Sequence, residues 1–174
     1  AGSDVIIFEL ASESGGSTRL SSAEIYMGGN GGTPIQQACG FDDATEDMVK
    51  FLEMTQGELG DKEKIQKYCE NSLDHYHWLV DKGAKYKESF HQERAVMALT
   101  DDCLLYTGNE KAEPFVSEAK PCPRGHNLEI EGDNGGPLLM KHLTNAVNDR
   151  GIDVHYETRA LSLIVDEYNA VCGL

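Results

Sequence analysis

The first stretch whose residue types could do chemistry lies near the start of the sequence, in DVIIFELASESGGST. An apolar run ends around Glu9, and Gly15 and Gly16 follow in a loop of small residues. A carboxylate at the end of a buried strand can accept hydrogen bonds from both hydroxyls of an adenosine ribose. The backbone N–H groups of the glycine loop, with the hydroxyls of Ser17 and Thr18, can contact a phosphate. The alternative is a solvated charge followed by an ordinary turn.

The complete glycine fingerprint of a dinucleotide-binding fold does not accompany this stretch. The segment GGNGGTP at residues 28–34 fails the pattern G-x-G-x-x-G in every register, because Asn30 or Pro34 stands where a glycine is needed. It also follows Glu9 instead of preceding it. The missing strand, glycine turn and helix would take on the order of 30 residues. The stretch therefore corresponds to a second strand without its first.

A second group of candidate residues lies in the middle of the chain. The loop CPRGHN places Arg124 two residues before His126, and such a pair can hold a carboxylate or polarise a carbonyl. A surface turn is the alternative. Tyr106 in LLYTGNE can donate or pass a proton, although a tyrosine is more often packed by its ring. Cys122 with His126 would form half of a zinc site and lacks a second ligand pair, so we expect no metal.

Composition excludes several classes of function. The chain has 174 residues, with 30 acidic and 15 basic side chains and a net charge of -15. Such a charge repels nucleic-acid backbones and anionic lipids. No apolar run approaches the ~20 residues of a membrane span, and the N-terminus has no signal-peptide pattern. The five cysteines are scattered, which indicates reduced thiols. We expect a cytoplasmic protein without a nucleic-acid partner or a membrane span.

The elements that must position these residues alternate between strand and helix. The strand-like pieces cover residues 5–10, 152–157, 160–167 and 170–174. The apolar helical patterns cover residues 42–57, 61–81 and 137–151, with Gly83 and Gly151 as stop signals. The first strand reads as buried on both faces. A loop is expected from residue 11 to 34, and an irregular, short-stranded region from 86 to 131. This order is typical of the α/β class with mixed additions in the middle.

The order of these motifs resembles the FAD-binding region of the 3-ketosteroid dehydrogenase and fumarate reductase flavoprotein superfamily. The run VIIFELASESGGSTRLSSAEIYMGGNGGTPIQQACGFDDATEDMVKFL is similar to that family's strand-ending Glu, Gly-Gly-Ser/Thr loop and small-residue stretch beside the isoalloxazine. The runs TDDCLLYTGNEKAEPF, AKPCPRGHN, GGPLLMKHL and GIDVHYETRALSLIVDE resemble later parts of the same region. The resemblance covers nearly the whole chain, and it is nearer to actinobacterial-type 3-oxosteroid dehydrogenases than to fumarate reductases.

This resemblance implies a partial Rossmann-like FAD/NAD(P)-binding domain with a helical and irregular insertion, and FAD as the cofactor. It divides the chain into residues 1–40 with the second strand and flavin loop, 41–126 as the insertion, and 127–174 as the return helix and strands. It places Ser21, Ser22 and Ala23 near the flavin ring and the backbone of Ala160 at the adenine. The full set of expected cofactor-binding residues is Glu9, Gly15, Gly16, Ser17, Thr18, Ser21, Ser22, Ala23 and Ala160.

The resemblance also implies hydride transfer between the flavin and a carbon next to a carbonyl or carboxylate. A 3-ketosteroid dehydrogenase acting on a steroid-like ketone is the first expectation, and the direction of transfer stays open. The alternatives are reduction of a small unsaturated acid, as in fumarate reductases, and a non-catalytic domain that associates with copies of itself as a homo-oligomer. The expected catalytic residues are Tyr106, Arg124 and His126.

Two parts of the family's pattern are missing from this sequence. The N-terminal GxGxxG and the substrate-capping domain have no counterpart in it. We therefore interpret the chain as a piece of a larger flavoenzyme. The piece by itself is expected to be inactive and to bind FAD weakly or not at all, because the pyrophosphate loop and much of the sheet are absent from it.

Overall fold

The computed structural model describes residues 2–96 and 99–174. Met97 and Ala98, which belong to the predicted irregular region, lie outside the described residues, as does Ala1 of the predicted first segment. The elements in chain order are β1 (Ile6–Phe8), α1 (Gly16–Arg19), β2 (Ile25–Tyr26), α2 (Pro34–Ala38), α3 (Thr45–Gln56), the 3-10 helix η1 (Gly57–Leu59), α4 (Lys62–Glu70), α5 (Ser72–Asp81), β3 (Leu104–Leu105), α6 (Phe115–Glu118), β4 (Gly125–His126), α7 (Gly135–Asn148), β5 (Asp153–His155), β6 (Ile164–Val165) and β7 (Val171–Gly173).

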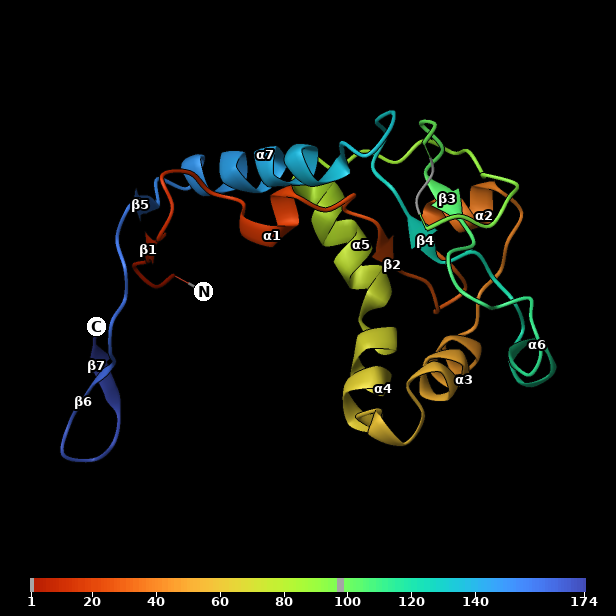
Figure 1. Cartoon of the computed structure of the whole chain (residues 1–174), viewed down its shortest axis with the longest axis horizontal. Coiled ribbons are helices and arrows are strands. Elements are labelled where there is room, and N and C mark those ends of the chain that lie inside the picture. The colour runs from red at the N-terminus through yellow and green to blue at the C-terminus, as the bar shows by residue number, and fades with distance from the viewer. Residues whose placement is uncertain (1, 97–98) are drawn as a thin grey trace.

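The chain forms an elongated molecule (Figure 1). The strands β2, β4 and β3 lie at one end with α2, α3 and α6, and the hairpin of β6 and β7 lies at the other. Helix α7 runs between these ends with α1 beside it. The predicted α/β class is confirmed. Among the described helices, none is long and apolar enough to cross a membrane.

The strands β1 and β5 form a two-stranded parallel sheet. Their register pairs Ile6 with Asp153 and Phe8 with His155. The expectation that the first strand is buried on both faces is wrong for this chain, since Ile6 is 57% and Phe8 43% exposed. Pairing with a single neighbour satisfies backbone groups along one edge and leaves the faces of such a short sheet uncovered. The apolar composition of the run predicted the strand but could not predict what covers it.

The main hydrophobic core lies around a second, antiparallel sheet of order β2–β4–β3. Its register pairs Ile25 and Leu104 with the same residue of β4, His126. Helix α5 contributes Tyr76 and Leu79 to the buried cluster. This sheet takes β2 from the predicted segment 1–40 and its other strands from 41–126. The division of the chain into three parts stays a prediction.

The helix predicted over residues 61–81 is two helices, α4 and α5. The break is at Asn71, whose φ is -100° and ψ 6°. The side-chain amide of Asn71 donates a hydrogen bond to the carbonyl of Lys67 at 2.7 Å. A short amide side chain can satisfy backbone groups that a continuous helix would use, which favours a helix end there. The predicted stop at Gly83 is confirmed, with φ +101°.

The other predicted helices and strands are present, but some of them begin or end at different residues than expected. The helix expected at residues 42–57 is α3, and the three closing strand-like pieces are β5, β6 and β7. Helix α7 begins at Gly135, two residues before the expected start at Pro137. The region 11–34, expected to be a loop, contains α1 and β2, and α2 begins at its end. Thr33 and Gln36 form a reciprocal capping box at the start of α2, a signal that the sequence contains.

Candidate functional site

The first candidate site lies at the carboxyl ends of β1 and β5. Glu9 directly follows β1, and its backbone N–H donates to the carbonyl of His155 at 2.9 Å. The N–H of Thr158 donates to the carbonyl of Glu9 at the same distance. One carboxylate oxygen of the half-buried Glu9 accepts a hydrogen bond from the N–H of Ala11 at 2.8 Å. The carboxyl ends of parallel strands are where α/β sheets bind nucleotides.

A groove of about 370 Å³ places Glu9 with part of the glycine loop. Four of the expected cofactor-binding residues line it, namely Glu9, Gly15, Gly16 and Thr18. Helix α7 supplies much of the opposite wall, with Met140, Leu143, Thr144 and Val147. The groove thus combines a carboxylate and backbone groups on one side with a largely apolar wall on the other.

The glycine loop presents its backbone to this groove. Gly15 has φ +139° and Gly16 has φ +48°, which are conformations that favour glycine. Helix α1 begins at Gly16 with no side-chain hydrogen bond capping it, and the first N–H groups of a helix have no partner within the helix. A Cβ added at Gly16 would meet no heavy atom within 4 Å. The loop therefore offers open backbone donors of the kind that bind phosphate.

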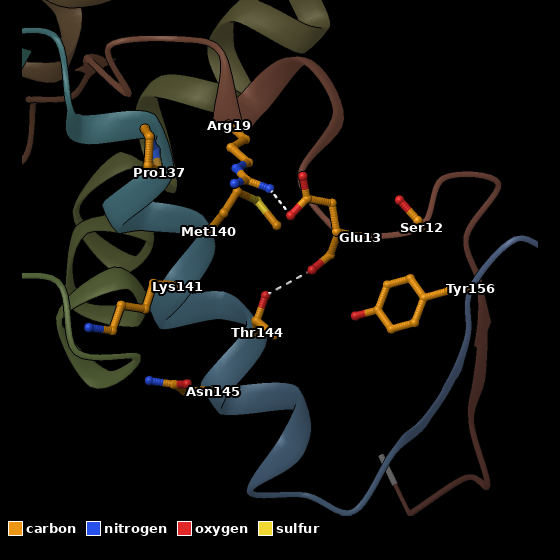
Figure 2. A pocket seen from close by; sticks show the side chains of 10 residues that line it. Ser12, Glu13, Arg19, Pro137, Met140, Lys141, Thr144, Asn145 and Tyr156 are labelled. Carbon is orange, nitrogen blue, oxygen red and sulfur yellow. Dashed lines mark hydrogen bonds and ion pairs between the residues drawn. The ribbon is translucent and has the colours of Figure 1, made fainter.

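A second groove, of about 460 Å³, adjoins the first and shares Ser14, Met140, Thr144 and Tyr156 with it. Figure 2 shows that Arg19 reaches from α1 toward Glu13, with which it forms an ion pair. The hydroxyls of Ser14 and Thr144 lie 3.2 Å apart and join the loop to α7. The segment after β5 contributes Tyr156, on the side facing α7 (Figure 2). The loop that follows Glu9 is therefore held in place by contacts with α7.

The amino end of α7 contacts the loop that carries Ser21, Ser22 and Ala23. The N–H of Gly136 donates to the carbonyl of Ser21 at 3.0 Å. A Cβ at Gly135 would lie 2.0 Å from the carbonyl oxygen of Ser22. Glycine is required at this crossing because the two backbones approach too closely for a side chain. The sequence analysis did not predict this close backbone packing. The Gly-Gly pair directly before a helix-starting proline is a sequence signal that could have indicated it.

The other expected cofactor-binding residues are more dispersed. Ser17 is exposed on α1. Ala23 has φ +54° and its N–H donates to the hydroxyl of Ser21. Ala160 lines a separate groove of about 470 Å³ with Phe8 and residues of the C-terminal hairpin. The structure thus brings part of the expected set together around Glu9, and places Ala160 in a groove of its own.

Arg124 lies in the interior beside the β2–β4–β3 sheet. Its side chain is fully buried and forms a two-point ion pair with Asp43, with Nε–Oδ2 at 2.8 Å and Nη2–Oδ1 at 2.6 Å. The remaining nitrogen, Nη1, donates to the Tyr26 hydroxyl at 3.4 Å. Burial by itself would lower the pKa of Arg124, but the hydrogen bonds and charge of Asp43 raise it above the ordinary value. The guanidinium is charged and its nitrogens all have partners.

His126 is also fully buried, between partners that determine its tautomer. Its Nδ1 lies 2.8 Å from the carbonyl oxygen of Arg124, and its Nε2 lies 2.8 Å from the hydroxyl of Thr33. A carbonyl can only accept, so Nδ1–H donates to it and Nε2 accepts from Thr33. Burial lowers the pKa of His126 to about 4, which keeps the ring neutral at pH 7.

Tyr106 is packed by aromatic rings. Its ring centroid lies 6.0 Å from that of Phe90 and 6.4 Å from that of Phe41, both edge-on. The Lys111 ammonium lies 3.8 Å from the centre of the Tyr106 ring. Burial raises the pKa of Tyr106 to about 12. Tyr106, Arg124 and His126 therefore gather around one sheet, apart from the grooves beside Glu9, and their catalytic roles stay predictions.

Comparisons with known proteins identify the family to which the chain is similar. A family model described as an FAD binding domain matches residues 1–174. Among solved structures, 3-ketosteroid-delta4-(5alpha)-dehydrogenase from Rhodococcus jostii RHA1, in complex with 4-androstene-3,17-dione, is 43% identical with a TM-score of 0.92. The match covers 98% of this chain and 36% of that chain.

A second solved structure is the open conformation of a flavocytochrome c3 fumarate reductase. It is 25% identical with a TM-score of 0.73, and the match covers 98% of this chain and 25% of that chain. No curated protein matches the chain. The chain thus spans about a third or less of the length of these two structural relatives.

Proposed function

The chain belongs to the FAD-binding domain family, and from that membership we propose that it is part of an FAD-dependent oxidoreductase acting on a 3-ketosteroid. The observation that carries the proposal is the groove at the carboxyl ends of β1 and β5. It gathers Glu9 and the open glycine loop in a fold similar to that of a ketosteroid dehydrogenase.

The residues present fit the adenosine and phosphate parts of FAD. The carboxylate of Glu9 would accept the ribose hydroxyls, and the N–H groups at the start of α1, with the Thr18 hydroxyl, would donate to phosphate. The backbone of Ser21 and Ser22, held against α7, would border the flavin ring. The cofactor itself supplies the hydride acceptor or donor. This chain's contribution is to bind FAD and hold it in a fixed orientation.

The substrate class is the finer part of the proposal. The higher sequence identity favours a steroid-like ketone, and the second structural match keeps reduction of a small unsaturated acid as the alternative. Assays of the full-length natural protein with 4-androstene-3,17-dione and with fumarate distinguish the two. We expect turnover of the steroid with an artificial electron acceptor. Turnover of fumarate alone would overturn the steroid assignment and leave the flavoenzyme assignment intact.

Substitution of Glu9 tests the binding of the cofactor. In the full-length protein, Glu9→Ala is expected to raise the Kd for FAD by roughly 10- to 150-fold, because hydrogen bonds to a charged acceptor contribute ~1.5–3 kcal/mol. Titration of the apoprotein with FAD, followed by flavin fluorescence, measures this Kd. Asp4→Ala is the matched control, since Asp4 is an exposed acid before the same strand. An equal Kd for the Glu9→Ala variant and the wild type would contradict the ribose assignment.

The remaining expectations stay predictions. The catalytic roles of Tyr106, Arg124 and His126 are among them. A cytoplasmic location and a homo-oligomer also stay predictions. Arg124 and His126 are 0% exposed in this structure, so each side chain must move before it contacts a ligand.

A further inference from the structure

Ala23 has a backbone conformation that residues with a side chain rarely adopt. Its φ is +54°, in the left-handed region, where the Cβ of an L-residue lies too close to a carbonyl oxygen. The residue is 6% exposed and belongs to the main core cluster together with Leu139 of α7. A strained conformation of this kind persists only where the surrounding structure holds it in place.

The side-chain hydroxyl of Ser21 connects two backbone groups of the turn that spans residues 18–23. It donates a hydrogen bond to the carbonyl oxygen of Thr18 at 2.8 Å. It also accepts a hydrogen bond from the backbone N–H of Ala23 at 3.1 Å. A serine hydroxyl has one proton to donate and lone pairs to accept with, so both bonds form at the same time. One side chain therefore joins the two ends of this turn.

These contacts account for the strained φ of Ala23. The angle describes the rotation between the peptide plane that precedes Ala23 and the rest of that residue. The hydrogen bond from the N–H of Ala23 to Ser21 fixes the peptide plane. Burial in the core fixes the other side of the rotation, because the Ala23 methyl is packed there. The positive φ follows from these two constraints acting together.

Helix α7 holds the same turn from its other side. The N–H of Gly136 donates to the carbonyl of Ser21 at 3.0 Å. A Cβ added at Gly135 would lie 2.0 Å from the carbonyl oxygen of Ser22 and 3.4 Å from the Ala23 methyl. The backbone of Ser21 is therefore bound to α7 through its carbonyl, while its hydroxyl bonds remain within the turn.

We propose that Ser21 is a positioning residue for the flavin and not one of its direct ligands. Its hydroxyl holds Ala23 at positive φ and thereby fixes the stretch of backbone that borders the flavin ring. This role rests on the proposed function, in which the chain binds FAD. The hydroxyl proton is already donated to the Thr18 carbonyl, so the side chain has no proton left to donate to the cofactor.

Two substitutions, alone and combined, test the proposal in the full-length protein. Ser21→Ala should raise the Kd for FAD about 3- to 10-fold, the range expected for loss of one neutral hydrogen bond. It should also change the visible absorption spectrum of FAD bound at saturation, which a change in protein stability by itself does not move. Ala23→Gly makes a positive φ inexpensive. In that background, Ser21→Ala should change the Kd less than about twofold and leave the spectrum unaltered.

Two further variants serve as the rescue and the control. Ser21→Thr keeps the hydroxyl at an exposed position and should retain the wild-type spectrum. Thr55→Val removes a matched bond, in which the Thr55 hydroxyl donates to the carbonyl of Leu52 at 2.9 Å. That bond also joins a hydroxyl to the carbonyl three residues earlier, but it lies at the exposed end of α3. Thr55→Val should therefore bind FAD with the wild-type Kd and spectrum.

The comparison of the two backgrounds decides the role of Ser21. If Ser21→Ala changes the Kd and the spectrum equally in the wild type and in Ala23→Gly, the hydroxyl contacts the flavin directly and the proposal is overturned. An unaltered Kd and spectrum in Ser21→Ala would also overturn it. The Tm of the FAD-free protein should fall in Ser21→Ala, and fall less in the Ala23→Gly background. An equal fall in both backgrounds would contradict the hold on the turn, whereas a wild type that binds no FAD would contradict the proposed function.

Discussion

Arg124→Met is expected to lower the free energy of unfolding of the full-length protein by about 3–5 kcal/mol. The substitution leaves the Asp43 carboxylate, which is 1% exposed, buried without its partner. It also removes a donor to the Tyr26 hydroxyl. The Coulomb attraction and the hydrogen bonds disappear together, while the desolvation of Asp43 remains. Chemical denaturation followed by circular dichroism measures the loss.

A double variant and an exposed pair provide the controls. Arg124→Met combined with Asp43→Leu removes both charges and should recover part of the loss, because no unpaired charge remains. Lys50→Met breaks the exposed pair with Glu118 at 3.3 Å and should cost less than about 1 kcal/mol. A stability loss below about 1 kcal/mol for Arg124→Met, with a raised KM, would instead support the substrate-binding role that the sequence indicated.

Gly136→Ala is expected to lower the free energy of unfolding by about 3 kcal/mol and to weaken FAD binding. The added Cβ would lie 2.2 Å from the carbonyl oxygen of Ser21 and 2.4 Å from that of Thr18. Both atoms belong to backbone and cannot rotate away, so α7 and the loop must separate. The loop that ends at Ala23 would then lose its support. Denaturation curves and FAD titrations of the full-length protein measure the two effects.

Gly173→Ala is the matched control for this substitution. Gly173 in β7 has an ordinary backbone conformation, and the nearest atom to its added Cβ is the Ile164 methyl at 3.4 Å, an ordinary contact distance. Its free energy of unfolding and its FAD affinity should stay close to those of the wild type. Wild-type behaviour of Gly136→Ala would mean that the crossing of α7 and the loop is not rigid, and would remove the support proposed for the flavin loop.

The local features of the candidate site could be predicted from the sequence. Glu9 after an apolar run and the glycine pair at residues 15 and 16 indicated a strand end and a nucleotide loop, and the structure places them in one groove. These features depend on neighbours within a few residues, which the sequence contains. The division of the predicted helix at Asn71 was harder to predict. One long helix with an unfavourable residue and two successive helices have nearly the same apolar pattern.

The partners of the buried polar residues could not be predicted. Arg124 and Asp43 are 81 residues apart in the sequence, and their spacing contains no sign of contact. For the same reason, His126 in a Pro/Gly-rich loop was assigned to a surface turn or to a ligand, whereas its ring lies between Thr33 and two tyrosines.

The sequence by itself therefore determined the α/β class, the position of the strand that directly precedes Glu9, the glycine loop and the membership of an FAD-binding family. Those properties follow from local conformational preference and from motifs whose residues are close together in the chain. Only the tertiary structure decided that Gly135 and Gly136 pack against the backbone of Ser21 and Ser22, and that Arg124 is neutralised by Asp43. Burial and pairing depend on contacts between distant segments, and only folding determines those contacts.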